Sequence, residues 1–141
     1  MEQHIHIITL AVADFERSRR FYTEILGWKL AAASQDDIAF FQAGGVVFAL
    51  YPRDKLAEDA TVDHQGSGFP GFTLAYNAQS EAEVDEIIHQ LEVQGVTIVK
   101  HPQKVFWGGY SSYFADPDGY LWEVAHNPFI AFDDAGNLRM D

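Results

Sequence analysis

Residues 114–128, Phe-Ala-Asp-Pro-Asp-Gly-Tyr-Leu-Trp-Glu-Val-Ala-His-Asn-Pro, join a turn to a strand that carries one acidic residue. The Asp-Pro-Asp-Gly sequence at 116–119 predicts a tight turn, because Asp bonds the backbone ahead of it, Pro fixes φ and Gly accepts a positive φ. In the strand that follows, alternation places Glu123 on one face with Leu121 and Ala125. A carboxylate on an otherwise apolar face costs free energy unless it is paired. We therefore expect Glu123 to meet a protein donor, a metal or a ligand.

The chain repeats one order of elements, which is the main indication of its fold. Asp14 and Gly27 bracket a helix in the first half, while Ser80 with Glu83 begins, and Gly95 ends, a helix in the second half. Apolar and β-branched runs predict the strands. Each half therefore has the order β-α-β-β-β, an internal repeat. The predicted strands are 5–12, 28–32, 38–42 and 46–51, and then 71–76, 96–100, 110–115 and 120–125.

The sequence predicts a single α+β domain over residues 1–141. One module alone exposes a face of a four-stranded sheet, so the two modules must pair to bury it. We expect a curved mixed sheet around a concave trough. The parts are a first βαβββ module at 4–55, a linker loop at 56–68, a second βαβββ module at 69–127 and a C-terminal tail at 128–141, with a small hairpin around 133–137.

Composition excludes several classes of function. The formal charge is −12 and the basic residues are scattered, which argues against nucleic acid as a partner. The chain has no Cys, so it forms no disulfides and offers no thiolate as a metal ligand or nucleophile. No apolar run approaches the ~20 residues that cross a bilayer. The sequence therefore predicts a cytoplasmic protein that binds neither nucleic acid nor a membrane.

Several motifs, taken with the repeat, resemble the vicinal oxygen chelate superfamily. They are Leu-Ala-Val-Ala-Asp at 10–14, Arg-Arg-Phe-Tyr at 19–22, Leu-Gly-Trp at 26–28, Asp-Pro-Asp-Gly at 116–119 and Trp-Glu at 122–123. The superfamily includes glyoxalase I, extradiol dioxygenases, fosfomycin-resistance enzymes and bleomycin-resistance proteins. The resemblance covers residues 4–127 and implies the glyoxalase/bleomycin-resistance fold. It implies less about activity, because one fold hosts unrelated functions.

The resemblance also implies where a metal would bind. The positions of the superfamily's ligands fall on Ile7, Ala49, Phe72 and Glu123, and only Glu123 is a ligand-type residue. Sites for divalent ions need about three or four protein ligands. We therefore expect neither a metal nor another cofactor.

Two alternatives to a metal-free chain stay open at this stage. A β-bulge would shift the register by one residue and bring His6 to the first ligand position. His64, His101 or His126 would otherwise have to converge on Glu123. The structural alternative for Glu123 itself is a carboxylate satisfied by a Tyr, His or Arg side chain.

Aromatic residues supply the other candidate ligand contacts. In Phe-Trp-Gly-Gly-Tyr at 106–110, Trp107 and Tyr110 flank a glycine pair and would form an aromatic rim that stacks on a ligand. Phe48 and Phe72 would add contact area in the trough, although aromatic residues at strand spacing commonly form the core.

These observations favour metal-free binding of a small apolar or aromatic molecule in the trough, as in bleomycin-resistance proteins. Glu123 would be its polar anchor, and the resemblance implies a homodimer. The alternative is an enzyme, a glyoxalase-like lyase or isomerase or a dioxygenase, in which Glu123 acts as a catalytic base or completes a metal site. A third possibility is a scaffold protein whose trough is filled by Phe48 and Phe72.

Overall fold

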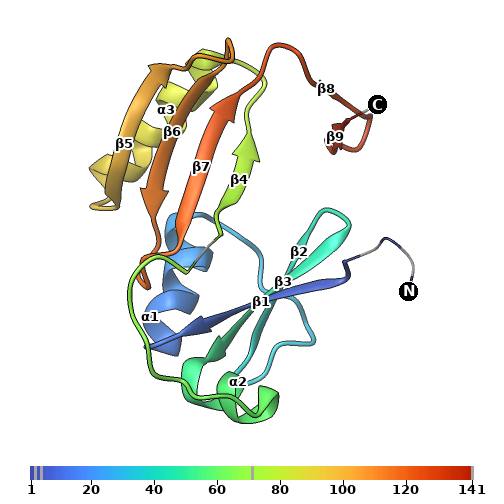
Figure 1. Cartoon of the computed structure of the whole chain (residues 1–141), viewed down its shortest axis with the longest axis vertical. Coiled ribbons are helices and arrows are strands. Elements are labelled where there is room, and N and C mark those ends of the chain that lie inside the picture. Colours follow the sequence, from blue (N-terminus) through green and yellow to red (C-terminus); the bar gives the residue numbers. More distant parts are fainter. Residues whose placement is uncertain (2, 4, 71, 141) are drawn as a thin grey trace. The chain divides into compact units, whose positions relative to one another are not determined.

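The computed structural model describes the chain except for residues 2, 4, 71 and 141. It divides into two compact units, residues 1–68 and 69–141. Each unit combines a β-sheet with helices, which confirms the α+β class (Figure 1). The trough expected between the modules stays a prediction. Along the described ranges, no helix is both long enough and apolar enough to span a membrane.

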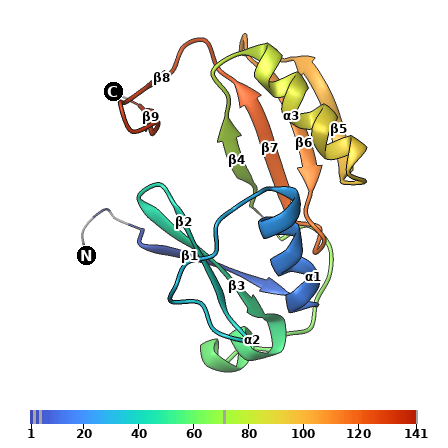
Figure 2. The same ribbon diagram turned by 180° about the vertical axis from the view of Figure 1, so that it is seen from behind.

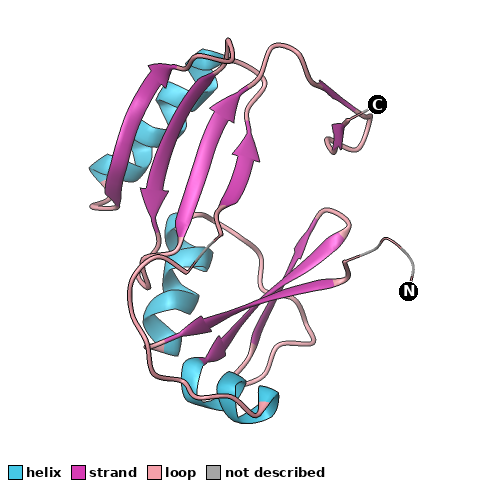
Figure 3. Cartoon of the chain, in the orientation of Figure 1, coloured by secondary structure: helices cyan, strands magenta, loops and turns pink. Residues whose placement is uncertain are grey.

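Unit 1 contains a three-stranded sheet in the order β1-β3-β2. Strand β1 runs parallel to β3, and β2 runs antiparallel to β3, to which the tight turn at residues 44–45 joins it. Helices and strands are distinguished by colour in Figure 3. The elements are β1 (Ile7–Val12), α1 (Phe15–Arg20), the π-helix η1 (Phe21–Ile25), β2 (Ala39–Ala43), β3 (Val46–Pro52) and α2 (Arg53–Ala60).

Two expectations for unit 1 are wrong. The strand predicted at 28–32 is only an isolated bridge between Leu30 and Phe41, because the Trp28 ring turns into an aromatic cluster with Tyr22 and Phe48. Residues 56–60, assigned to a loop, belong to helix α2, which ends at Thr61 in the left-handed conformation.

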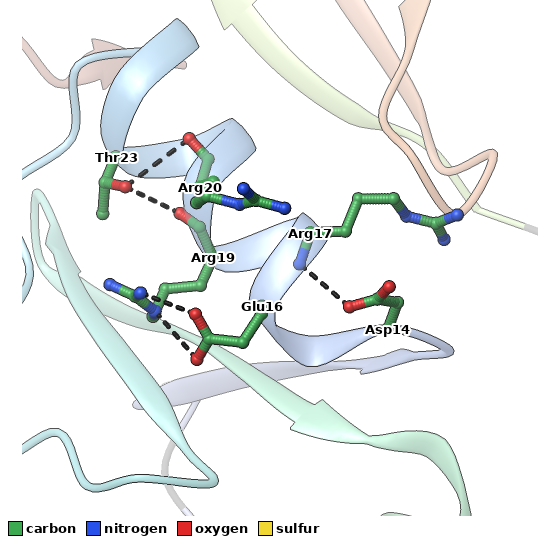
Figure 4. A network of polar contacts seen from close by, with 6 residues as sticks. All are labelled: Asp14, Glu16, Arg17, Arg19, Arg20 and Thr23. Carbon is green, nitrogen blue, oxygen red and sulfur yellow. Dashed lines mark hydrogen bonds and ion pairs between the residues drawn. The ribbon is translucent and has the colours of Figure 1, made fainter.

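The start of α1 is fixed by its own polar side chains (Figure 4). Asp14 is the expected N-cap, and its carboxylate accepts a hydrogen bond of 3.0 Å from the Arg17 backbone N–H. One turn on, Arg19 forms a 2.7 Å ion pair with Glu16. The Thr23 hydroxyl donates to the Arg19 carbonyl at 2.9 Å, where α1 continues into η1. Local chemistry therefore sets the beginning of this helix.

Unit 2 contains a four-stranded sheet in the order β4-β7-β6-β5, with β4 parallel to β7 and the other pairs antiparallel. Helix α3 lies across one face of this sheet (Figure 2). A two-stranded hairpin follows and confirms the one expected in the tail. The elements are β4 (Leu74–Asn77), α3 (Glu81–Val93), β5 (Thr97–Lys104), β6 (Tyr110–Ala115), β7 (Leu121–His126), β8 (Ala131–Phe132) and β9 (Leu138–Arg139). The strand predicted from residue 71 begins at Leu74, and Gly71 lies outside the described residues.

The caps and turns predicted for unit 2 are present. Ser80 accepts a 3.2 Å hydrogen bond from the Glu83 N–H, and Gly95 ends α3 with a φ of 81°. In the turn at 116–119, the Asp116 carboxylate accepts from the backbone N–H groups of Asp118 and Tyr120, both at 2.9 Å. This turn sets the register between β6 and β7, and that register positions the candidate site.

Candidate functional site

Side chains alternate along each strand of the unit 2 sheet, so they divide between its two faces, and the register decides which of them lie side by side. Tyr110 donates a 2.7 Å hydrogen bond to Asp85 of α3, so it lies on the face that α3 covers. Trp122 and Val124 are buried on that same face by alternation. We call the opposite side the Glu123 face. One row of directly paired residues across it consists of Lys100 of β5, Tyr113 of β6, Glu123 of β7 and Ala75 of β4.

Glu123 is half-buried and is hydrogen-bonded on this face. The buried Ser111 hydroxyl donates to Glu123 Oε2 at 3.0 Å. Tyr113 stands directly opposite Glu123 on the neighbouring strand. Burial and then the negative charge and hydrogen bonding of Glu123 raise the pKa of Tyr113 above its ordinary value, while a hydrogen bond with Thr73 opposes the rise. The phenol therefore stays protonated near neutral pH and is a hydrogen-bond donor beside the carboxylate.

Lys100 completes the row on the other side of Tyr113. Its ammonium lies 5.7 Å from the centre of the Tyr113 ring, within the range of a cation–π contact. The residue is half-buried, and within the described chain it forms no ion pair with a carboxylate. The Glu123 face thus presents a cation, an aromatic ring and a carboxylate in succession.

The surroundings of Glu123 are more polar than expected. Leu121 and Ala125 do share its face, as alternation predicts, but its neighbours on β6 are Ser111 and Tyr113. Sequence reasoning missed these two residues and Lys100. A signal was available, because counting back from the turn at 116–119 pairs Tyr113 with Glu123. Lys100 could not be found in this way, since β5 contains register shifts on either side of it.

Tyr110 does not join Glu123, in contrast to the prediction. It is an odd number of residues from Tyr113, so alternation turns it to the α3 face, where its hydroxyl bonds Asp85. Lys104 lies 5.8 Å from its ring centre and forms an ion pair with Glu81 of α3. All of these polar groups are therefore satisfied within unit 2.

Trp107 lies in the turn between β5 and β6, where its ring covers a glycine. A Cβ added to Gly109 would lie only 1.7 Å from Trp107 Cζ3, and one added to Gly108 would lie 2.9 Å from the Phe129 ring. The two glycines therefore allow aromatic rings to pack on the backbone. Trp107 is 38% exposed and Phe106 is fully exposed, so both rings reach the surface of unit 2, whereas Tyr110 bonds Asp85 on the α3 face. The rim of Trp107 and Tyr110 as a ligand contact stays a prediction.

The two phenylalanines occupy different environments. Phe48 is buried, with its ring centre 5.0 Å from that of Tyr22, on the face of the unit 1 sheet opposite Ala49. It is a core residue of unit 1 and does not line an open surface there, because alternation directs it toward the aromatic cluster. Phe72 is 40% exposed, and its ring centre lies 5.7 Å from that of Tyr120.

The residues present do not fit a metal. No group of three or more His, Cys, Asp or Glu side chains suited to a metal occurs among the described residues. Strand β1 pairs with β3 without a register shift, so no bulge brings His6 to the place of Ile7. The three other candidate histidines have contacts elsewhere: His101 bonds Glu92 at 2.8 Å, His126 bonds the Ala78 carbonyl at 3.1 Å, and His64 lies against Gln65.

The family model of the Glyoxalase/Bleomycin resistance protein/Dioxygenase superfamily matches residues 4–124, and the chain therefore belongs to this superfamily. The match confirms the family inferred from the motifs.

Individual relatives support the assignment of the chain to this superfamily. The chain is 31% identical over 129 residues to metallothiol transferase FosB of Staphylococcus saprophyticus, covering 88% of this chain and 77% of that protein. It is 32% identical over 123 residues to fosfomycin resistance protein FosX of Listeria monocytogenes, covering 83% and 84%. A crystal structure of a glyoxalase-related enzyme from Fulvimarina pelagi superposes with a TM-score of 0.89 at 33% identity, covering 99% of each chain.

Proposed function

We propose that this protein binds a small molecule without a metal, on the Glu123 face of unit 2. The observation that carries the proposal is the environment of Glu123. Its half-buried carboxylate has hydroxyl partners, Ser111 and Tyr113, and no cationic partner within the described chain. A carboxylate has about four acceptor positions, so these two donors leave capacity for a ligand.

The polar surroundings alter the expected ligand. Tyr113 offers a ring and a hydroxyl beside Glu123, so it takes the aromatic role that the sequence suggested for Tyr110. Trp107 stays a candidate contact because it is partly exposed. The ligand therefore combines a flat or apolar part with at least one polar group, whereas a purely apolar molecule would leave the polar atoms of this face unpaired.

A metal-dependent enzyme is the second candidate, and the names of the relatives favour it. A metallothiol transferase is among the relatives, and a glyoxalase-related enzyme is among the similar structures. In that case Glu123 would hold a metal or act as a general base for a lyase, isomerase or dioxygenase reaction. The hydrocarbon side chains of Ile7 and Phe72 at the implied ligand positions argue against metal binding.

Metal analysis and thermal unfolding distinguish these functions. After dialysis, we expect less than stoichiometric Ni, Zn, Fe or Mn in the wild type and in Glu123→Gln. In a screen of small polar aromatic compounds, a ligand at about a hundred times its Kd should stabilise the wild type by roughly 2.7 kcal/mol. Glu123→Gln should lose this stabilisation.

Asp85→Asn is the matched control, because Asp85 also accepts a tyrosine hydroxyl but does so on the α3 face. It should retain ligand binding. Stoichiometric metal that is lost in Glu123→Gln would contradict the proposal. Equal ligand affinity in the wild type and Glu123→Gln would also contradict it. The homodimer implied by the resemblance stays a prediction, which light scattering in solution can check.

A further inference from the structure

Three paired residues form a charged row on the Glu123 face: Lys100, Tyr113 and Glu123. They lie on the adjacent strands β5, β6 and β7, with Tyr113 directly paired to both of the others. Neighbouring strands are about 4.8 Å apart, so the backbones at Lys100 and Glu123 are separated by about 10 Å. Opposite charges therefore stand on the two sides of one aromatic ring.

The same two strands carry a second lysine–tyrosine pair, which shows what is missing from the first. Lys104 lies 5.8 Å from the Tyr110 ring centre, much as Lys100 lies 5.7 Å from that of Tyr113. On the α3 face, however, Lys104 has Glu81 as its ion partner. Within the described ranges, Lys100 has only the ring.

The charges at the ends of the row do not neutralise each other directly. No ion pair joins Lys100 and Glu123 within the described chain. Both residues are half-buried, so each has lost part of its hydration without gaining an opposite charge in contact. A molecule that carried one charge of each sign would supply both missing partners together.

We infer that the ligand of the Glu123 face is a zwitterion, with its cationic group at Glu123, its anionic group at Lys100 and a flat middle on the Tyr113 ring. This inference rests on the proposed small-molecule site and names its ligand class. A singly charged molecule would satisfy one end of the row and leave the other end unpaired, and hydrogen bonds to charged groups are stronger than those between neutral groups. The row therefore selects for two charges at a fixed separation.

A matched set of probes tests this class. para-Aminomethylbenzoate carries an ammonium and a carboxylate at opposite ends of one ring. Benzylamine has only the cation, benzoate has only the anion and benzyl alcohol has neither. Calorimetric titration at low salt should give para-aminomethylbenzoate a Kd at least about tenfold below that of each other probe, since tenfold corresponds to a modest charged contact.

Variants assign each end of the ligand. Lys100→Met should remove the preference for para-aminomethylbenzoate over benzylamine, and Glu123→Gln should remove its preference over benzoate. Lys104→Met is the matched control, because it deletes the equivalent cation on the α3 face, and it should leave all four affinities unchanged. Lys100→Gln repeats the test with a polar side chain, and an unchanged unfolding midpoint shows that each variant is folded.

Other outcomes separate the failure of this inference from that of the proposed function. Benzylamine or benzyl alcohol binding as tightly as the zwitterion, in a manner that depends on Glu123, would overturn the zwitterion while keeping the small-molecule site. No binding by any of the four probes would overturn the zwitterion as well. Affinities that Glu123→Gln leaves unchanged would overturn both.

Discussion

Replacing Phe48 with alanine tests whether this residue belongs to the core of unit 1 or to a ligand site. Its ring centre lies 5.0 Å from that of Tyr22, 5.4 Å from that of Trp28 and 6.3 Å from that of Phe41. The side chain is 3% exposed, so the change deletes a buried ring and leaves a cavity. Phe→Ala changes in cores cost about 3–5 kcal/mol. The free energy of unfolding of a folded domain is only about 5–15 kcal/mol in total.

We therefore expect Phe48→Ala to lower the thermal midpoint by roughly 9–15 °C, at about 3 °C for each kcal/mol in a chain of this size. Circular dichroism during heating or urea titration measures the loss. Phe72→Ala is the matched control, because Phe72 is 40% exposed and has one described ring contact, with Tyr120. Phe72→Ala should lower the free energy of unfolding by about 1 kcal/mol. Equal losses in the two variants, or a small loss in Phe48→Ala together with weakened ligand binding, would refute the assignment of Phe48 to the core.

Two further predictions concern unit 2. Burial and the charge of Glu123 raise the pKa of Tyr113, so above about pH 10 the unfolded chain loses a proton that the folded chain keeps, and stability falls as pH rises. Urea midpoints should therefore fall less between about pH 8 and 10.5 in Tyr113→Phe than in the wild type, and an equal fall would show that folding does not raise the pKa of this phenol. Gly109→Ala would place a Cβ 1.7 Å from the Trp107 ring and should cost about 1–3 kcal/mol in thermal unfolding. Gly45→Ala, where nothing lies within 4 Å, is its control, and equal tolerance of the two changes would contradict the packing of Trp107 on Gly109.

Some features of this protein follow from short stretches of sequence. The turn at 116–119, the caps at Asp14 and Ser80 and the end of α3 at Gly95 all appear where local chemistry predicts them. These features are predictable because a side chain bonds the backbone within a few residues, or because one residue must adopt a positive φ. The repeated order of elements also identifies the fold class, since it depends on hydrophobic period and length.

Which residues pair across neighbouring strands depends on contacts between the strands, so the sequence of one strand does not show its partners. The face of Glu123 follows from alternation within β7, and its pairing with Tyr113 follows from the turn between β6 and β7. The pairing of Tyr113 with Lys100 depends on the register of β5. A shift of one residue exchanges the two faces of a strand, and this parity separates Tyr110 from the candidate site and places Phe48 in the core. The sequence alone determined the helix caps, the turn at 116–119 and the face on which Glu123 lies. The resemblance implied that Glu123 is the one ligand-type residue at the superfamily's metal positions. Only the tertiary structure decided that Lys100 completes this row, because the register of β5 shifts on both sides of that residue.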